Sequence, residues 1–492
     1  MNRYHFPQRE MRDALREALP CNDQTASDPT RKPQFTYVPP SHARALDPEN
    51  TIVEGIRGAG KSHWWTVLNS EQHRDYLTSV FPETRITHNL IVSQGFGVGL
   101  GSKDAPGKDT LANLIKEYDP RHIWQAVIAV HAGFPEPFPN TPGKWTVMVN
   151  WVKENPEDYD NLLDDIDLQL ARQNKTRLIM FDALDRLGND WPSIRPLARS
   201  LFQLALDIRA RRAIRLKLFV RSDMLEDRGI LAFTDSSKLL AKKVPLVWRR
   251  VDLYALLFQC LGNADTQGEM FRFQCERLFS QTWKQDENTP AWQIPQSMRT
   301  DEDLQREIFH AITGYWMGSG PKRGAPYTWL PNHLIDGRDQ VSPRSFAAVL
   351  RYAVENDQPH TDTWPWALHY RAIQAGAQEA SRIRVDEITR EDYPWVETLM
   401  QPLRSKITVP CEPKEMIQLW KKDKTIGKLQ TACKENEVRL PPVHIEEGEQ
   451  GILQDLVDLG VIQRLADQRI QMPDIYRVAF GFGRRGGVKP LK

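Results

Sequence analysis

The stretch Thr51-Ile-Val-Glu-Gly-Ile-Arg-Gly-Ala-Gly-Lys-Ser62 contains an uninterrupted G-x-x-x-x-G-K-S pattern directly after a short apolar run. This pattern is typical of a loop that cradles phosphate groups between a strand and a helix. Its three glycines permit positive φ angles and let backbone N–H groups come close to an anion. Residues 63–69 are predicted to form a helix whose N-terminal end faces the phosphates. A chance glycine-rich turn is the alternative, and the flanking strand and helix argue against it.

Two side chains of this loop have defined tasks in the pattern. Lys61 is expected to reach the β- and γ-phosphates, and the Ser62 hydroxyl is expected to ligate Mg²⁺. The predicted nucleotide-binding residues are Gly55, Arg57, Gly58, Ala59, Gly60, Lys61, Ser62 and His63. The segment Asn174-Lys-Thr-Arg177 lacks an aspartate that would pair with guanine, which argues against GTP. The sequence therefore predicts ATP, with Mg²⁺, as the ligand.

Composition describes an ordinary globular chain. Its 492 residues suggest about three domains. Hydrophobic residues make up 40%, and Lys+Arg (65) balance Asp+Glu (64), so overall charge does not favour a polyanionic partner. The five cysteines are scattered without C-x-x-C spacing, and neither a signal peptide nor a long apolar run is evident. We expect a cytoplasmic protein with reduced thiols and no membrane span.

Short apolar runs recur at spacings that suit a wound parallel sheet buried on both faces. They are Thr51–Glu54, Asn89–Ser93, Arg177–Phe181, Lys217–Val220 and Val244–Trp248. From about residue 249 to 400 the pattern is largely helical. Near the C-terminus, a helix from Ile452 to Leu459 precedes two short runs, 461–465 and 469–472, in the order of a winged helix.

The predicted fold class is therefore α/β, with a three-layer core around a parallel sheet, a helical lid and a C-terminal winged helix. The predicted division is an extended N-terminal segment over 1–45 with one short helix, a nucleotide-binding core over 46–250, the lid over 251–400 and the winged helix over 410–492.

A carboxylate that helps to hold Mg²⁺ is expected at the end of a neighbouring strand. Arg177-Leu-Ile-Met-Phe-Asp182 provides it, because Asp182 follows four apolar residues at the edge where ligands of wound sheets bind. Asp182 and Ser62 are thus the predicted metal ligands.

The two motifs together resemble P-loop ATPases of the KAP, STAND and origin-recognition types, whose second motif reads apolar run, Asp, variable, Leu or Ile, Asp-Arg. In many of these proteins an acidic residue directly follows the Mg²⁺ aspartate and polarises water. Here that residue is Ala183, which implies either that Asp185 takes over the task or that hydrolysis is slow. The alternative for Asp185 is a salt bridge with Arg186.

The same resemblance implies two arginines that sense the γ-phosphate. Arg221 ends the next strand, in Leu216-Lys-Leu-Phe-Val-Arg221, and a planar guanidinium suits phosphate oxygens. Its alternative is an ordinary ion pair with Asp223. Arg344, in Val341-Ser-Pro-Arg344, resembles the sensor arginine of the helical lid, and its alternative is a surface arginine. Asp185, Arg221 and Arg344 are the predicted catalytic residues.

The resemblance implies a nucleotide-dependent switch or motor that forms homo-oligomers or binds a partner protein, with bacterial defence as a context by analogy. Two alternatives stay open. One is an ATP-gated scaffold with little turnover, which Ala183 favours. The other is a DNA-binding initiator-like ATPase, which the winged helix and its arginines favour, and for which DNA would be a partner. The arginines and lysine concerned are Arg464, Arg469, Arg477, Arg484, Arg485 and Lys489.

Overall fold

The computed structural model describes residues 4–20, 31–139, 141–356, 364–435, 437–485 and 488–491. Cys21, on which part of the cysteine argument rests, lies outside these ranges, whereas the other four cysteines are free thiols as expected. The chain divides into two compact units, one of residues 26–31 and 38–247 and the other of 1–25, 32–37 and 248–492. The predicted four-part division stays a prediction.

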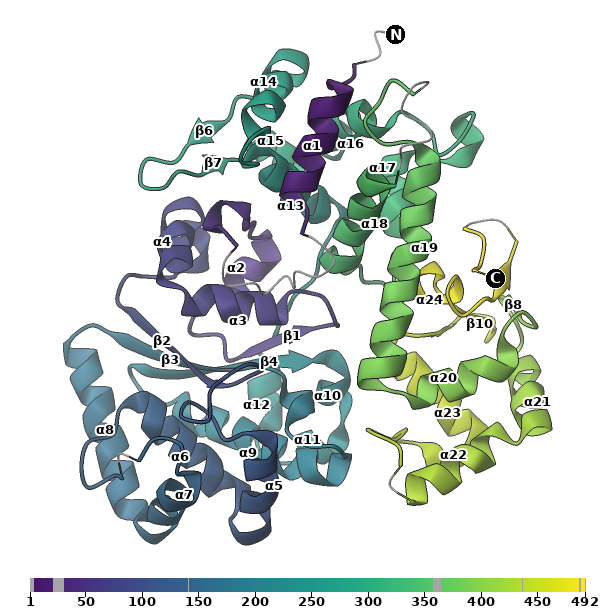
Figure 1. Cartoon of the computed structure of the whole chain (residues 1–492). Coiled ribbons are helices and arrows are strands. Elements are labelled where there is room, and N and C mark those ends of the chain that lie inside the picture. Colours follow the sequence, from purple (N-terminus) through teal and green to yellow (C-terminus); the bar gives the residue numbers. More distant parts are fainter. Residues whose placement is uncertain are drawn as a thin grey trace. The chain divides into compact units, whose positions relative to one another are not determined.

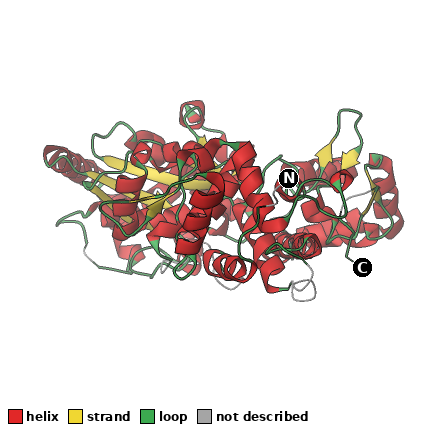
Figure 2. Ribbon diagram, turned by 90° about the horizontal axis from the view of Figure 1, so that it is seen from above, coloured by secondary structure: helices red, strands yellow, loops and turns green. Residues whose placement is uncertain are grey.

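The first of these units, which we call the sheet unit (26–31 and 38–247), is built on a parallel sheet of five strands in the order β2-β3-β4-β1-β5. The strands are β1 Ile52–Gly55, β2 Leu90–Phe96, β3 Thr176–Phe181, β4 Ile214–Arg221 and β5 Val244–Pro245. The longer of these strands are the yellow arrows that cross the sheet in Figure 2. All five predicted strands are confirmed, and β4 lies between the strands that carry the two motifs.

Helices cover both faces of this sheet (Figure 1). Helix α3 packs against β1, β2 and β4, whereas α6, α8 and α9 pack beneath β2, β3 and β4. The ring of Trp124 on α6 meets Phe96 and Phe181 edge-on at 5.9 and 5.7 Å, which joins the helix to β2 and β3. The helices of this unit are α2 Pro40–Leu46, α3 Lys61–Asn69, α4 Glu71–Val80, α5 Lys108–Glu117, α6 Pro120–Ala132, α7 Trp145–Glu154, α8 Pro156–Arg172, α9 Trp191–Ile208, α10 Ser222–Glu226, α11 Arg228–Leu231 and α12 Ser236–Leu240.

The buried side chain of Lys217 stabilises the turn between α2 and β1. Lys217 on β4 has no exposed surface, and its ammonium donates hydrogen bonds to the carbonyls of Ala45, Asp47 and Asn50 at 2.7, 2.9 and 2.7 Å. Buried backbone carbonyls need such donors. The turn between α2 and β1 is therefore closed around one side chain.

The second unit, which we call the helical unit (1–25, 32–37 and 248–492), is mostly helical, as predicted for the region after residue 249. Helix α1 Gln8–Ala18 packs on α13 and α18, and Phe6 just before it stacks on Phe271 at 5.4 Å. The helices of this part are α13 Arg250–Gly262, α14 Gly268–Phe279, α15 Gln296–Thr300, α16 Glu302–Thr313, α17 Pro326–Asn332, α18 Pro343–Glu355, α19 Tyr370–Asp386 and α20 Trp395–Met400, with a hairpin of β6 Lys284–Gln285 and β7 Trp292–Gln293.

The C-terminal part of the helical unit has helices followed by a hairpin, which is the order predicted for a winged helix. Helices α21 Pro413–Asp423, α22 Thr425–Lys434 and α23 Gly448–Asp458 precede the antiparallel strands β9 Gln463–Arg464 and β10 Ile470–Gln471. Helix α24 Asp474–Arg477 and the pair β8 Thr408–Val409 and β11 Gly483–Arg484 complete it. Among the described residues, no helix is long and apolar enough to cross a bilayer.

Candidate phosphate-binding site

The phosphate-binding motif forms the turn between β1 and α3. Gly58 and Gly60 have φ angles of 77° and 108°, a region that L side chains seldom adopt. Gly55 differs, because it is the last residue of β1, in register with Arg221. A Cβ there would come within 3.2 Å of the Cβ of Ala59, so the reason for this glycine is close packing. The expectation of a positive φ at Gly55 is wrong.

Lys61 lies at the start of α3 and folds back over the loop. Its Nζ donates to the carbonyls of Gly55 and Ile56 at 2.7 and 2.8 Å. Burial, together with a smaller effect of the Arg221 charge, lowers the pKa of Lys61 to about 8, although the charge of Asp182 opposes the shift. Two carbonyl groups therefore hold the Lys61 ammonium at the carboxyl end of β1. A bound phosphate would take the place of these carbonyls as the partner of the ammonium.

The other predicted nucleotide-binding residues line the turn and the first turn of α3. Ala59 closes the turn by donating its N–H to the carbonyl of Ile56 at 3.2 Å, and Arg57 is half-buried beside it. The His63 ring lies 4.9 Å from the ring of the buried Trp64. Their contacts with a nucleotide stay predictions.

Asp182 follows β3, and its side chain comes to the phosphate-binding loop. Its backbone N–H donates to the carbonyl of Phe96 at 2.9 Å, which holds it at the sheet edge. The carboxyl group is buried, and it accepts a hydrogen bond from the Ser62 hydroxyl. Burial raises the pKa of Asp182 despite the hydrogen bond from Ser62 and the charge of Lys61. A buried carboxylate of this kind gains stability from a nearby cation.

Arg221 and two carboxylates lie side by side at the same edge. Asp223 accepts from Nε and Nη2 of Arg221 at 3.1 and 3.2 Å, and an Asp185 oxygen lies 3.6 Å from Nη1. Each of the three side chains is 13–15% exposed. Asp185 therefore pairs with Arg221, whereas Arg186 is exposed. Sequence reasoning treated Asp223 only as an alternative partner, since spacing alone does not reveal a three-way contact.

Ala183 adopts the left-handed conformation, with φ 56° and ψ 41°. This region is unusual for a residue with a side chain and costs on the order of 1 kcal/mol. The turn directs the chain from β3 into the short 3₁₀ helix Leu184–Arg186, which carries Asp185 back beside Arg221. Asp185 therefore reaches the site although its sequence position is three residues beyond Asp182.

Arg344 lies at the start of α18 in the helical unit. It is exposed, and its Nη1 pairs with an oxygen of Glu387 at 2.7 Å. Its predicted contact with a γ-phosphate stays a prediction.

The arginines near the C-terminus differ widely in exposure. Arg477 has no exposed surface, because Asp474 and the carbonyls of Phe482 and Val488 accept its hydrogen bonds at 2.6, 2.9 and 2.5 Å. The expectation that Arg477 contacts DNA phosphates is therefore wrong. Arg484 also pairs with Asp474, at 3.0 Å. Arg477 and Arg484 therefore help to hold this segment together, whereas Arg464, Arg485 and Lys489 stay exposed.

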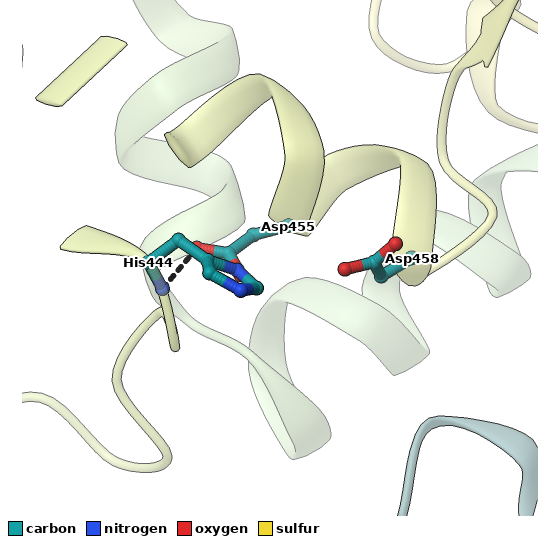
Figure 3. Close-up of side chains that lie close together, drawn as sticks. All are labelled: His444, Asp455 and Asp458. Carbon is teal, nitrogen blue, oxygen red and sulfur yellow. Dashed lines mark hydrogen bonds and ion pairs between the residues drawn. The ribbon is translucent and has the colours of Figure 1, made fainter. Parts of the chain in front are cut away.

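His444, Asp455 and Asp458 form a second cluster of polar side chains, on and beside α23 (Figure 3). The imidazole Nδ1 lies 2.7 Å from one Asp455 oxygen, and the His444 backbone N–H donates to the other at 3.1 Å. Asp458 accepts from Gln454 at 2.7 Å. Both Asp455 oxygens already have hydrogen-bond partners. We therefore interpret this cluster as a structural contact that holds the chain before α23 against the helix.

The solved structures that are similar to this chain share little of its sequence. No protein-family model matches the chain, and no curated protein matches it. Among solved structures, the chain is similar to the ORC2 protein of Aeropyrum pernix in ADPNP–ADP complexes, with 13% identity, a TM-score of 0.38, and coverage of 91% of this chain and 94% of that one.

Two further structures have a similar extent of overlap. The chain is similar to Cdc6p from Pyrobaculum aerophilum, with 10% identity, a TM-score of 0.29 and coverage of 92% and 94%. It is also similar to a Walker-type ATPase of Pyrococcus abyssi, with 14% identity, a TM-score of 0.36 and coverage of 90% and 97%. Similarity this low carries no argument about function. The strand order and the conformation of the phosphate-binding turn themselves confirm the predicted α/β P-loop fold.

Proposed function

We propose that this protein binds and hydrolyses ATP at the edge of its parallel sheet and uses the nucleotide as a switch. The observation that supports this most is the convergence of Lys61, Asp182, Asp185 and Arg221 on the phosphate-binding turn. These residues lie at or just beyond the carboxyl ends of β1, β3 and β4, which are adjacent strands of the sheet. Cationic, carboxylate and hydroxyl groups in this arrangement are what phosphoryl transfer to water requires.

In this proposal each side chain has one task. Lys61 and the loop N–H groups bind the β- and γ-phosphates, and Arg221 stabilises charge that develops on the γ-phosphate. Asp185 orients the attacking water and accepts its proton. Arg344 would sense the γ-phosphate for the helical unit. Only the family resemblance supports this role.

The residues at the loop suit a magnesium ion. The Ser62 hydroxyl and the buried Asp182 carboxylate share a hydrogen bond, and both are oxygen ligands of the kind that Mg²⁺ prefers. Bound with ATP, the ion would neutralise charge on the phosphate oxygens. Ser62 would hold the ion directly, and Asp182 would hold it or its water ligands.

Replacing Asp185 tests the hydrolytic part of the proposal. Asp185→Asn keeps the shape of the side chain but removes the base, so we expect the turnover number for ATP to fall about a hundredfold while the dissociation constant of ATP changes little. Steady-state phosphate release and equilibrium ATP binding measure the two quantities. Asp235→Asn, at an exposed ion pair of the same unit, is the control. Unchanged turnover in Asp185→Asn would exclude this role.

The pH dependence of ATP binding tests Lys61 separately. Because its pKa is about 8 in the nucleotide-free protein and bound phosphates would raise it, ATP binds the protonated form more tightly. We expect the dissociation constant of ATP to change little between pH 7 and 7.5 and to rise up to about tenfold per pH unit above 8. In Lys61→Arg the charge persists, and the slope should vanish. Equal slopes in the two proteins would contradict the assignment.

A second candidate function is an ATP-gated scaffold with little turnover. Ala183 favours it, because no carboxylate directly follows Asp182 and Asp185 is engaged by Arg221. This candidate predicts tight ATP binding, negligible phosphate release and a change in the mass of the protein particle when ATP is added, as measured by light scattering. ATP would then drive the formation of a homo-oligomer or the binding of a partner protein.

A DNA-binding, initiator-like ATPase is the third candidate, and it is supported by the helix-then-hairpin order of the C-terminal part. The exposed residues left for such contacts are Arg464, Arg484, Arg485 and Lys489, since Arg477 is buried. Arg484 also pairs with Asp474 at 3.0 Å. ATP turnover with and without duplex DNA, at two salt concentrations, tests it. A role in bacterial defence rests only on the resemblance.

A further inference from the structure

Asp223 occupies a position beside the phosphate-binding site that none of the proposed tasks uses. It is the second residue of α10, which begins directly after Arg221 at the end of β4. Both of its carboxylate oxygens accept from Arg221, from Nε at 3.1 Å and from Nη2 at 3.2 Å. Because a guanidinium is planar, a carboxylate that binds this edge fixes the direction of the whole group.

The orientation of Arg221 determines its distance from Asp185. With one edge bound to Asp223, Nη1 lies 3.6 Å from the nearest Asp185 oxygen, which is longer than a hydrogen bond. The three side chains are 13–15% exposed, so solvent screens their charges only in part. If Arg221 left Asp223, Asp185 would be a carboxylate already within ion-pair distance that Arg221 could bind bidentately.

We propose that Asp223 is a positioning residue that holds Arg221 so that Asp185 keeps an oxygen available for water. This inference rests on the proposed function, because it assigns Asp185 as the base and Arg221 as the phosphate-binding arginine. Asp223 does not touch the nucleotide in this scheme. Its effect is to prevent a bidentate pair between Arg221 and Asp185, which would occupy both groups at once.

The first expected result concerns Asp223→Asn, which keeps the size of the side chain and its place in α10. The amide loses the charge that binds Arg221 bidentately, so we expect the turnover number for ATP to fall about tenfold, with KM for ATP within twofold of wild type. Asp223→Glu keeps the charge and should recover most of the activity. A side chain that matters only for folding would instead lower the melting temperature of both variants.

Combining variants tests how Asp223 acts. If Asp223→Asn works by letting Arg221 occupy Asp185, it should lower turnover less than twofold in the Asp185→Asn background, because that carboxylate is already absent. Fully additive losses in the double variant would overturn the proposal, as would wild-type turnover in Asp223→Asn. Two controls are Asp235→Asn in the same unit and Lys61→Ala.

The results of these experiments distinguish a failure of the Asp223 proposal from a failure of the proposed ATPase function. Wild-type turnover that equals that of Lys61→Ala would overturn the ATPase function and this inference together. Turnover that needs Lys61 and Asp185 but not Asp223 would overturn the inference alone. Phosphate release by the full chain, with melting temperatures from the same preparations, provides all of these readouts.

Discussion

Lys61→Ala is expected to lower kcat/KM for ATP about a thousandfold, which corresponds to about 4 kcal/mol of transition-state stabilisation. The lysine is the cation that the motif places at the phosphates, and its Nζ already lies where two carbonyls, those of Gly55 and Ile56, converge. Without it, those carbonyls and the Asp182 carboxylate would face the phosphates with less compensating charge. Steady-state phosphate release and equilibrium ATP binding would measure the effect.

Two controls make the Lys61 experiment decisive. Lys103→Ala removes an exposed lysine of the same unit and should leave turnover within twofold of wild type. The melting temperature of Lys61→Ala should stay close to that of wild type, since the lysine side chain contacts the carbonyls of Gly55 and Ile56 rather than the apolar core of the sheet. Turnover that survives in Lys61→Ala would remove the basis for the proposed ATPase.

Lys217→Met is expected to lower the free energy of unfolding of the sheet unit by about 3–5 kcal/mol. The substitution keeps an unbranched side chain of similar length but removes every donor to the carbonyls of Ala45, Asp47 and Asn50. Leaving buried acceptors without a donor costs about 1–3 kcal/mol for each group that finds no other partner. The apolar thioether recovers part of this cost because Lys217 is surrounded by protein.

Urea denaturation followed by tryptophan fluorescence would measure this loss, and hydrogen exchange over residues 45–53 would locate it. Lys175→Met, at an exposed lysine just before β3, is the matched control and should change the unfolding free energy by less than about 0.5 kcal/mol. If Lys217→Met and Lys175→Met unfold at the same urea concentration, the lysine does not stabilise the turn before β1.

Local sequence patterns were sufficient to predict the elements of the fold. The five strands are short apolar runs because both faces of the sheet are covered, and such runs are visible without knowledge of their neighbours. Helix α1, residues 8–18, is the one short helix predicted for the N-terminal segment, and its apolar side chains Met11, Ala14 and Leu15 recur on one face. The motif from Gly55 to Ser62 predicted the turn between β1 and α3 for the same local reason.

Pairings between distant residues were not predictable in this way. Asp185 contacts Arg221 because β4 lies beside β3 in the sheet, and sequence order does not specify that neighbour. A Cβ at Gly55 would lie 3.2 Å from the Cβ of Ala59, which is tighter than most such contacts, so packing rather than the φ angle favours this glycine. Arg477, which the sequence suggested for DNA, is enclosed by Asp474 and two carbonyls.

The sequence by itself therefore determined the fold class, the phosphate-binding loop and the residue types of the candidate site. These follow from periodicity, glycine conformation and side-chain chemistry, which act over a few neighbouring residues. Only the tertiary structure decided which charges meet, including the bidentate hold of Asp223 on Arg221 and the closure of the turn before β1 by Lys217. Those contacts depend on strand order and burial, and both arise only when segments far apart in the chain pack together.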